Sequence, residues 1–224
     1  KCNDITLFFV QIFIHSNNES DWLEAKLDEA YPVVDHIVIL ESPFDFRKKP
    51  KPVYFSKTDP RFVRFADKII HHLYDKPTVF PKQKRHRKWA MEGQARYHAY
   101  IAVKSIIQNG DWIIQSDTDE VIRREALQLL RDCNVNYTSV SFALTGSYYG
   151  FEYYVGNWFL PIAVRFHDKT VNQTFARPLS KVTNAQAVIR SAGWHCGWCL
   201  PLKGIVHKLE TFSHTEFDKD EFKQ

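Results

Sequence analysis

Apolar and polar residues follow each other along the first part of the chain in blocks that predict strand, helix and strand. "TLFFVQIFI" (residues 6–14) and "HIVILE" (residues 36–41) are continuous apolar runs of the length of buried strands. Between them, "DWLEAKLDEA" places Leu23 and Leu27 on one helical face, and Pro32 ends that helix. Apolar strands joined by a helix indicate an α/β sheet with parallel neighbours.

The start of this helix carries a candidate capping signal. Asp21 and Glu24 have the D-x-x-E spacing of a capping-box variant, in which two side chains bind backbone N–H groups of the first turn. Together with Asp28 and Glu29, they form the side of the helix that we expect to face solvent.

The rest of the chain continues the alternation less regularly. Further predicted elements are a strand at residues 68–74, a long helix at 89–108, a strand at 112–115, a helix at 124–133 and a strand at 139–144. The remainder is rich in aromatic residues and is interpreted as irregular. We find no repeat and no internal boundary, so we expect one α/β domain over residues 1–224.

The predicted strand at residues 112–115 leads directly into three acids. In "GDWIIQSDTDEVI" these are Asp117, Asp119 and Glu120. Ligands of open α/β sheets lie at the carboxyl ends of strands, and residues i and i+2 of extended backbone point to the same side. Two adjacent carboxylates repel each other unless a divalent cation binds them, and Mg²⁺ and Mn²⁺ prefer oxygen ligands. We therefore interpret Asp117 and Asp119 as metal ligands, with a chance D-x-D as the alternative.

Other side chains are candidates for binding phosphate or transferring protons. Arg96 and Lys104 lie on the long helix before the acidic strand, where a phosphate-bearing substrate needs cations. His195 in "GWHCGW" and His214 in "FSHTEF" are candidate metal ligands or acid–base groups, or structural histidines. Aromatic side chains that could stack on a sugar, or pack in the core, are Tyr148, Tyr149, Tyr153, Trp158 and Trp198.

Charge and hydropathy narrow the choice of partners. The 224 residues carry a net charge of +4, much of it in "KQKRHRK" (residues 82–88). One short basic loop fits a phosphate-bearing small ligand or a solvated loop, whereas a nucleic-acid binder needs a wider basic face. No segment has the length of a membrane span. Because the chain begins at Lys1, a trimmed fragment is expected, and an anchor outside it stays open.

Cysteines and sequons bear on the compartment. "HCGWC" has C-x-x-C spacing, but Cys2 and Cys133 are isolated, so a zinc site lacks its second pair. A disulfide between Cys196 and Cys199 and two buried thiols are both open. The N-x-S/T sequons at positions 18, 136 and 172 favour the secretory pathway, with the cytoplasm as the alternative.

Several of these motifs occur in an order that resembles glycosyltransferase family 17. They are "VVDHIVILES", "GDWIIQSDTDEVI", "SYYGFEYY" and "AGWHCGWC", and the resemblance runs from about residue 8 to residue 214. It implies a single GT-A type domain, with a nucleotide-sugar half at about 1–120 and an acceptor half at about 121–224. It also implies an inverting transfer, a UDP-sugar donor with N-acetylglucosamine as the sugar, Mn²⁺ or Mg²⁺, a glycan acceptor and the Golgi lumen.

The same resemblance assigns roles to individual residues. Asp117 and Asp119 match the acidic motif that binds the metal, with Glu120 behind them, and His214 is a weaker third ligand. Residues implied on the donor side are Glu41, Arg96 and Asp117, and candidates for catalysis are His195 and Glu152, with Glu216 as a less favoured base. The competing interpretations are a metal-dependent phosphohydrolase with the same Asp pair and a non-catalytic carbohydrate-binding module.

Overall fold

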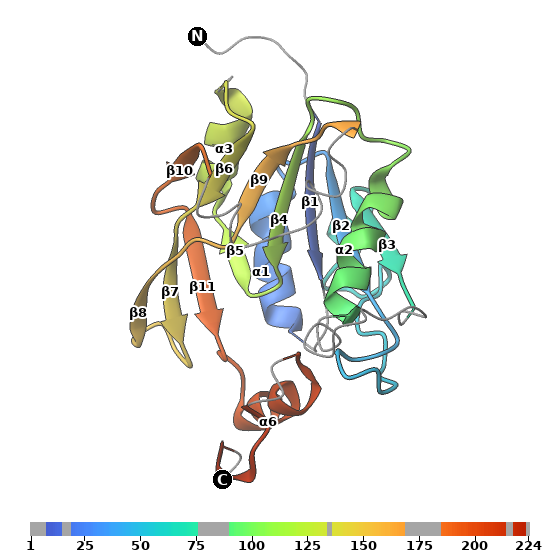
Figure 1. Cartoon of the computed structure of the whole chain (residues 1–224), viewed down its shortest axis with the longest axis vertical. Helices are drawn as coiled ribbons and strands as arrows, with labels where there is room; N and C mark the ends of the chain where they lie inside the picture. Colours follow the sequence, from blue (N-terminus) through green and yellow to red (C-terminus); the bar gives the residue numbers. More distant parts are fainter. Residues whose placement is uncertain are drawn as a thin grey trace.

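The computed structural model describes residues 8–14, 19–75, 90–133, 136–168, 185–213 and 217–222. They form a large and a small β-sheet, with helices on both faces of the large one (Figure 1). The large sheet has the order β10-β6-β9-β4-β1-β2-β3. Its strands are β1 (Phe9–Ile14), β2 (His36–Glu41), β3 (Ile69–Leu73), β4 (Trp112–Asp117), β6 (Ser139–Phe142), β9 (Ile162–Arg165) and β10 (Ala187–Ile189).

The large sheet is mixed but mostly parallel. β1 pairs in parallel with β2 and with β4, and β2 pairs in parallel with β3. Only β9, among the described strands of this sheet, runs antiparallel to its neighbours, β4 and β6. The α/β class and the parallel neighbours predicted from the apolar runs are therefore confirmed.

The large sheet is buried because helices cover both of its faces. Alternate residues of a strand point to opposite faces. Accordingly, Phe9 and Phe13 of β1 pack in a cluster with α1 and α3, whereas Val10 and Ile12 pack in a second cluster with α2. The helices of the described chain are α1 (Ser20–Ala30), α2 (Ala90–Val103), α3 (Arg124–Asp132) and α6 (Leu202–Thr211), with short 3₁₀ helices at Val63–Phe65 and Asp220–Phe222. None of them is long and apolar enough to cross a membrane.

The small sheet corrects the prediction of an irregular C-terminal half. Its strands are β5 (Glu120–Ile122), β7 (Leu144–Tyr148), β8 (Tyr154–Trp158) and β11 (Gly193–Gly197), in the order β5-β11-β7-β8. Each is at most five residues long, and β5 pairs with β11, which lies far away in the sequence. Such short strands with distant partners leave no continuous apolar run by which they could be recognised.

Two predicted helix ends are also wrong. Helix α1 begins at Ser20 with Glu19 at the N-cap, and no side chain caps it. Asp21 and Glu24 instead bind the guanidinium of Arg61, at 2.6 and 2.8 Å, so they do not form a capping box. Helix α2 ends at Val103, five residues before the predicted end at residue 108.

Gly193 is the first residue of β11 and lies opposite Ile122 of β5, where the backbone requires a glycine. It has φ +147°, and a Cβ there would lie 2.0 Å from the Val121 carbonyl oxygen. We expect Gly193→Ala to lower the free energy of unfolding by about 2–3 kcal/mol, from backbone strain and this clash. The measurement is urea unfolding followed by circular dichroism.

Gly93 provides the matched control for this substitution. It lies exposed within α2, and a Cβ there would meet no atom within 4 Å. Gly93→Ala is therefore expected to raise the free energy of unfolding by about 0.5–1 kcal/mol, since alanine favours helix. Equal effects of the two substitutions would contradict the account of Gly193.

Candidate active site

The acidic motif lies at the junction of the two sheets. Asp117 is the last residue of β4, which lies between β1 and β9, and Glu120 begins β5 of the small sheet. The turn between them is tied to the end of β1 by Thr118, whose Oγ1 donates to the Ile14 carbonyl at 2.9 Å. The motif thus occupies the carboxyl edge of the parallel strands, where ligands of α/β sheets bind.

Glu120 holds this turn from inside the protein. It is fully buried, and its Oε2 accepts the backbone N–H of Asp117 at 2.7 Å. Its Oε1 accepts the indole N–H of Trp158 at 2.6 Å, and the Trp158 ring stacks on His195 with 4.1 Å between ring centroids. One carboxylate therefore fixes both the acidic turn and, through Trp158, the position of His195.

Lys26 supports the turn from the opposite side, from α1. Its side chain is buried, and its Nζ donates to the Ser116 hydroxyl at 2.9 Å and to the Glu120 carbonyl. Lys26 is not among the residues predicted from the sequence. The signal was present, because a lysine next to Leu27 and three residues after Leu23 lies on the apolar face of the helix.

Asp119 belongs to a buried cluster of charges that includes Lys208 of α6. The Lys208 ammonium lies 3.0 Å from Asp119 Oδ2 and 2.8 Å from Glu19 Oε1. His195 Nδ1 lies 3.8 Å from Asp119 Oδ1 and 3.3 Å from the Asp119 backbone oxygen. The ammonium is thus shared by two carboxylates that come from the start of α1 and from the acidic turn. Neither Glu19 nor Lys208 was singled out from the sequence.

The pKa values of the two buried carboxyl groups in this cluster are shifted in opposite directions. Burial alone would raise the pKa of Asp119, but Lys208 and His195 lower it below its ordinary value. Burial raises the pKa of Glu19, and the charge of Asp119 adds to this, which together outweigh the opposite effect of Lys208. Burial would lower the pKa of Lys208, but the two carboxylates raise it, so the ammonium stays charged.

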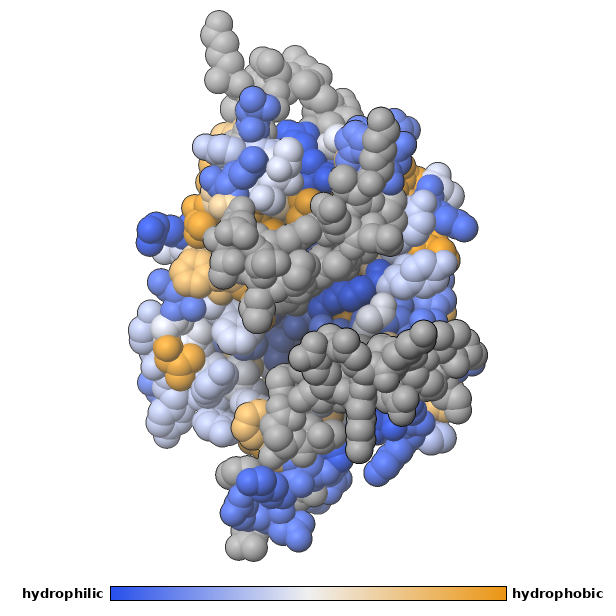
Figure 2. Space-filling view, viewed as in Figure 1, coloured by the Kyte–Doolittle hydropathy of each residue, from blue (hydrophilic) through white to orange (hydrophobic). Residues whose placement is uncertain are grey.

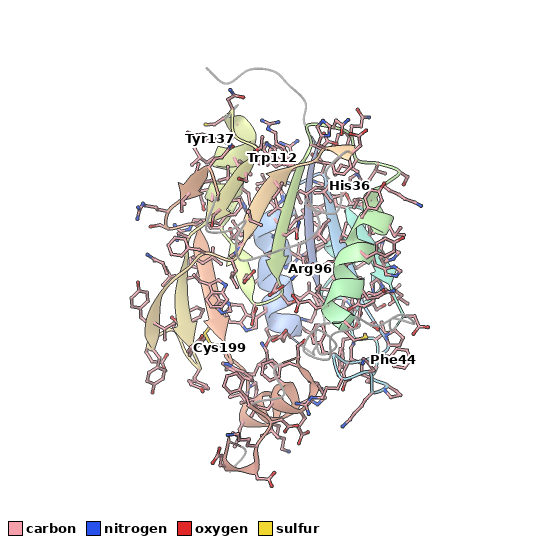
Figure 3. The ribbon with its side chains drawn as sticks, in the orientation of Figure 1. His36, Phe44, Arg96, Trp112, Tyr137 and Cys199 are labelled. Carbon is pink, nitrogen blue, oxygen red and sulfur yellow. A yellow bond between two sulfur atoms is a disulfide. The ribbon has the colours of Figure 1, made fainter. Side chains whose placement is uncertain are left out.

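Asp117 and Asp119 have different partners. Asp117, whose side chain is 45% exposed, lies 3.6 Å from the guanidinium of Arg96, which also binds Glu92 at 3.2 Å. Figure 3 shows Arg96 reaching from α2 toward the end of β4. One carboxylate is thus paired with Arg96 and the other with Lys208, and their joint binding of one metal ion stays a prediction. They are nevertheless close enough for the charge of Asp117 to raise the pKa of Asp119.

The donor chemistry of the cluster fits a hard divalent cation. Asp117, Asp119 and Glu19 offer carboxylate oxygens, the ligands that Mn²⁺ and Mg²⁺ prefer. Within the described residues, no three His, Cys, Asp or Glu side chains are arranged to hold an ion. His214, the third ligand implied by the resemblance, lies outside the described residues, as do Glu216 and the basic loop at residues 82–88.

Glu41 lies at the end of β2, as its position in the sequence predicts, but its carboxylate is engaged by the protein. It is fully buried and accepts the backbone N–H groups of Tyr54 and Phe55, at 2.5 and 3.2 Å. Lys51 Nζ and His71 Nε2 lie 3.5 and 3.2 Å from its oxygens. Glu41 therefore anchors the loop after β2, and its contact with a nucleoside stays a prediction.

Glu152 is separated from this network. It lies exposed in the turn between β7 and β8, where its carboxylate folds back over Gly150. His195, by contrast, is 6% exposed and lies in the network itself. The structure thus brings together Arg96, Asp117, Asp119 and His195 and leaves Glu152 outside the group.

The chain matches known proteins over nearly its whole length. The family model "Glycosyltransferase family 17" matches residues 8–223. Two β-1,4-mannosyl-glycoprotein 4-β-N-acetylglucosaminyltransferases, from Homo sapiens and Mus musculus, are 24% and 23% identical over 92% of this chain. The chain spans only 43% of the length of each of these relatives.

A solved structure with a similar fold is glucosyl-3-phosphoglycerate synthase from Mycobacterium tuberculosis, in complex with Mn²⁺, UDP and glucosyl-3-phosphoglycerate. It is 13% identical, has a TM-score of 0.41, and the match covers 92% of this chain and 80% of that one.

Proposed function

The chain belongs to glycosyltransferase family 17, and we propose that it transfers a sugar from a nucleotide-sugar donor to a hydroxyl group of a glycan. The observation that carries the proposal is the acidic turn after β4, which Glu120 and Lys26 hold at the carboxyl edge of the large sheet. Its mixed α/β sheet agrees with the GT-A type of fold expected from the sequence. The relatives, which are N-acetylglucosaminyltransferases, support N-acetylglucosamine as the sugar, and UDP is the carrier expected from the resemblance to the family.

Asp117 and Asp119 are the residues that we propose to bind Mn²⁺ or Mg²⁺ with the donor. The bound cation would neutralise the diphosphate and stabilise the charge that develops on the leaving nucleoside diphosphate. Arg96 lies beside Asp117 and would orient that carboxylate and contribute positive charge near the phosphates. Lys208 would supply a second cation next to Asp119.

His195 is the better candidate for the base in an inverting transfer, in which the acceptor hydroxyl attacks the face opposite the leaving group. Asp119 next to Nδ1 would stabilise the imidazolium that forms when His195 accepts a proton. Within the described chain, no hydrogen bond is found at Nε2 of His195. The Tyr148 ring lies near this Nε2, since a Cβ at Gly197 would meet both of them, at 2.5 and 3.5 Å.

One covalent feature and one surface feature bear on the compartment. Cys196 and Cys199 form a disulfide, which is typical of an oxidising compartment. Asn136, which begins the sequon "NYT", is exposed and thus accessible to glycosylation. Both features support the lumen of the secretory pathway.

Calorimetric titration of UDP and UDP-N-acetylglucosamine, with and without Mn²⁺, tests the donor side. We expect Mn²⁺-dependent binding that weakens at least about tenfold in Asp117→Ala, because a carboxylate ligand is lost. Asp67→Ala is the matched control, since Asp67 is an exposed carboxylate whose hydrogen-bond partner within the described chain is the Tyr31 hydroxyl.

Two outcomes of this titration, and one of a product assay with UDP-N-acetylglucosamine, would count against the proposal. No binding of either nucleotide in the presence of Mn²⁺ would favour a carbohydrate-binding module. Binding of equal strength in Asp117→Ala and Asp67→Ala would remove the acidic motif from the donor site. Rapid release of sugar to water, with no gain on adding glycan, would identify a hydrolase.

A further inference from the structure

The turn between β7 and β8 exposes an unusual number of aromatic rings. Tyr149, Phe151, Tyr153 and Tyr154 are 60–64% exposed, and Tyr148 is partly exposed. We call these five residues the aromatic platform. In Figure 2 the lower left of the molecule, where Figure 1 places β7 and β8, is pale, which matches the intermediate hydropathy of tyrosine. Contiguous exposed aromatic surface is a common feature of ligand-binding sites.

The platform is held in one conformation by its backbone. Tyr149 has φ +65°, a left-handed conformation that is costly for a bulky residue, and its N–H donates to the Gly197 carbonyl at 2.9 Å. Trp198 has φ +64° and lies between the disulfide-bonded Cys196 and Cys199. Backbone strain of this kind persists where the surrounding structure enforces it, and it clusters at binding sites.

The platform is continuous with the candidate active site. β11 aligns His195 with Gly146 of β7, and Gly146 aligns with Gly156 of β8, so two glycines lie beside the imidazole on the same face. A Cβ at Gly197 would lie 2.5 Å from the Tyr148 ring, so that ring lies over the end of β11. A ligand bound beside His195 would therefore extend over this face toward the hairpin.

The opposite side of the platform is closed by helix α1. The Phe151 ring packs against Trp22 with 6.0 Å between centroids, and the Trp22 indole N–H donates to the Cys199 carbonyl at 3.3 Å. Figure 3 shows Cys199 at the end of β11, between the hairpin and α6. The platform thus borders α1, which begins at the N-cap Glu19, and faces the same side of the molecule as α6, which carries Lys208.

The chemistry of the platform selects an uncharged, amphipathic ligand. Four of its five residues are tyrosines, and each combines an apolar ring face with a hydroxyl. Between residues 144 and 159 the one charged residue is Glu152, so the cations that bind nucleic acid or anionic lipid are missing there. Sugar rings have apolar C–H faces and hydroxyl edges, which match tyrosine and a single carboxylate.

We propose that the aromatic platform binds the acceptor oligosaccharide, through sugar units beyond the one whose hydroxyl is glycosylated. This inference rests on the proposed function, since it supplies that transferase with the recognition of its acceptor. Glu152, which lies in the platform, would then accept hydrogen bonds from sugar hydroxyls instead of acting as the base.

The test is the double variant Tyr153→Ser/Tyr154→Ser. Both rings are exposed, Tyr153 in the turn and Tyr154 at the start of β8, so the variant removes two rings of the platform while keeping the backbone bonds. With an N-glycan oligosaccharide of mannose and N-acetylglucosamine as the acceptor, we expect the acceptor KM and the calorimetric Kd to rise about tenfold or more. The kcat and the Kd for UDP with Mn²⁺ are expected to stay within about twofold.

Tyr137→Ala is the matched control, because Tyr137 is exposed but lies at the opposite end of the molecule (Figure 3). An unchanged Kd for the oligosaccharide in the double variant, or no binding of it by the unaltered protein, would overturn the inference. A dimer that the double variant dissociates would assign the platform to a second copy of the chain. Absence of UDP binding by the unaltered protein would count against the proposed function instead. The two results are independent, because the glycan Kd is measured without donor.

Discussion

Replacing Lys208 by methionine is expected to lower the free energy of unfolding by about 3–5 kcal/mol at pH 7, the usual cost of removing one partner from a buried ion pair. The ammonium is shared by Glu19 and Asp119, whose side chains are only 6% and 13% exposed. Methionine has a similar length and keeps the packing of α6, so the loss arises from two unpaired buried carboxylates. Urea unfolding at several pH values measures it.

The pH dependence of Lys208→Met identifies the cause of its loss. Burial raises the pKa of both carboxyl groups, and Lys208 is the main group that opposes this. Without it, both folded-state pKa values should lie above the unfolded values, so the protonated forms stabilise the fold. Stability is then present at low pH and is lost as pH rises through the raised pKa values. We therefore expect a smaller deficit at pH 5 than at pH 8.

Lys203→Met, an exposed lysine of the same helix, is the control and is expected to change the free energy of unfolding by less than about 0.5 kcal/mol. A deficit for Lys208→Met that is the same at pH 5 and pH 8 would show that the carboxylates are not its source.

The parts of the fold that could be predicted are the elements whose burial shows as consecutive apolar residues in the sequence. β1 and β2 are buried on both faces, so each is a largely apolar run, and β4 begins with three apolar residues. The parallel pairing of β1 with β2 follows from the helix between them. The capping box failed because Asp21 and Glu24 bind Arg61, about forty residues away. Local spacing cannot reveal a partner that the fold supplies.

The same limit separates the predicted from the unpredicted parts of the site. Asp117 and Asp119 are visible because acids directly follow an apolar strand. Lys208, the counter-ion of Asp119, could not be recognised, because it meets Asp119 only after α6 has packed beside the end of β11. His195 reaches Asp119 only because β11 pairs with β5, which places His195 opposite Glu120. The family resemblance supplied His195, but not the contacts that orient it.

Replacing Glu120 by glutamine is expected to lower kcat about 100-fold, with little change in the donor KM. The carboxylate accepts two donors, the Asp117 N–H and the Trp158 indole N–H. A glutamine of the same shape has one acceptor oxygen and one NH₂ group, so one of these donors faces another donor. The acidic turn or the Trp158–His195 stack then shifts, and a shift of about 1 Å in a catalytic group costs roughly 100-fold.

Trp158→Phe distinguishes the two consequences of Glu120→Gln. It keeps a ring for His195 to stack on but removes the indole donor, so glutamine can then direct its oxygen to Asp117 and its NH₂ group away from any donor. We therefore expect Glu120→Gln to be milder in the Trp158→Phe background than in the unaltered protein. The readout is a double-mutant cycle on kcat with thermal melting of each variant. Additive effects would show that Glu120 does not act through Trp158, and that His195 is oriented by Asp119 alone.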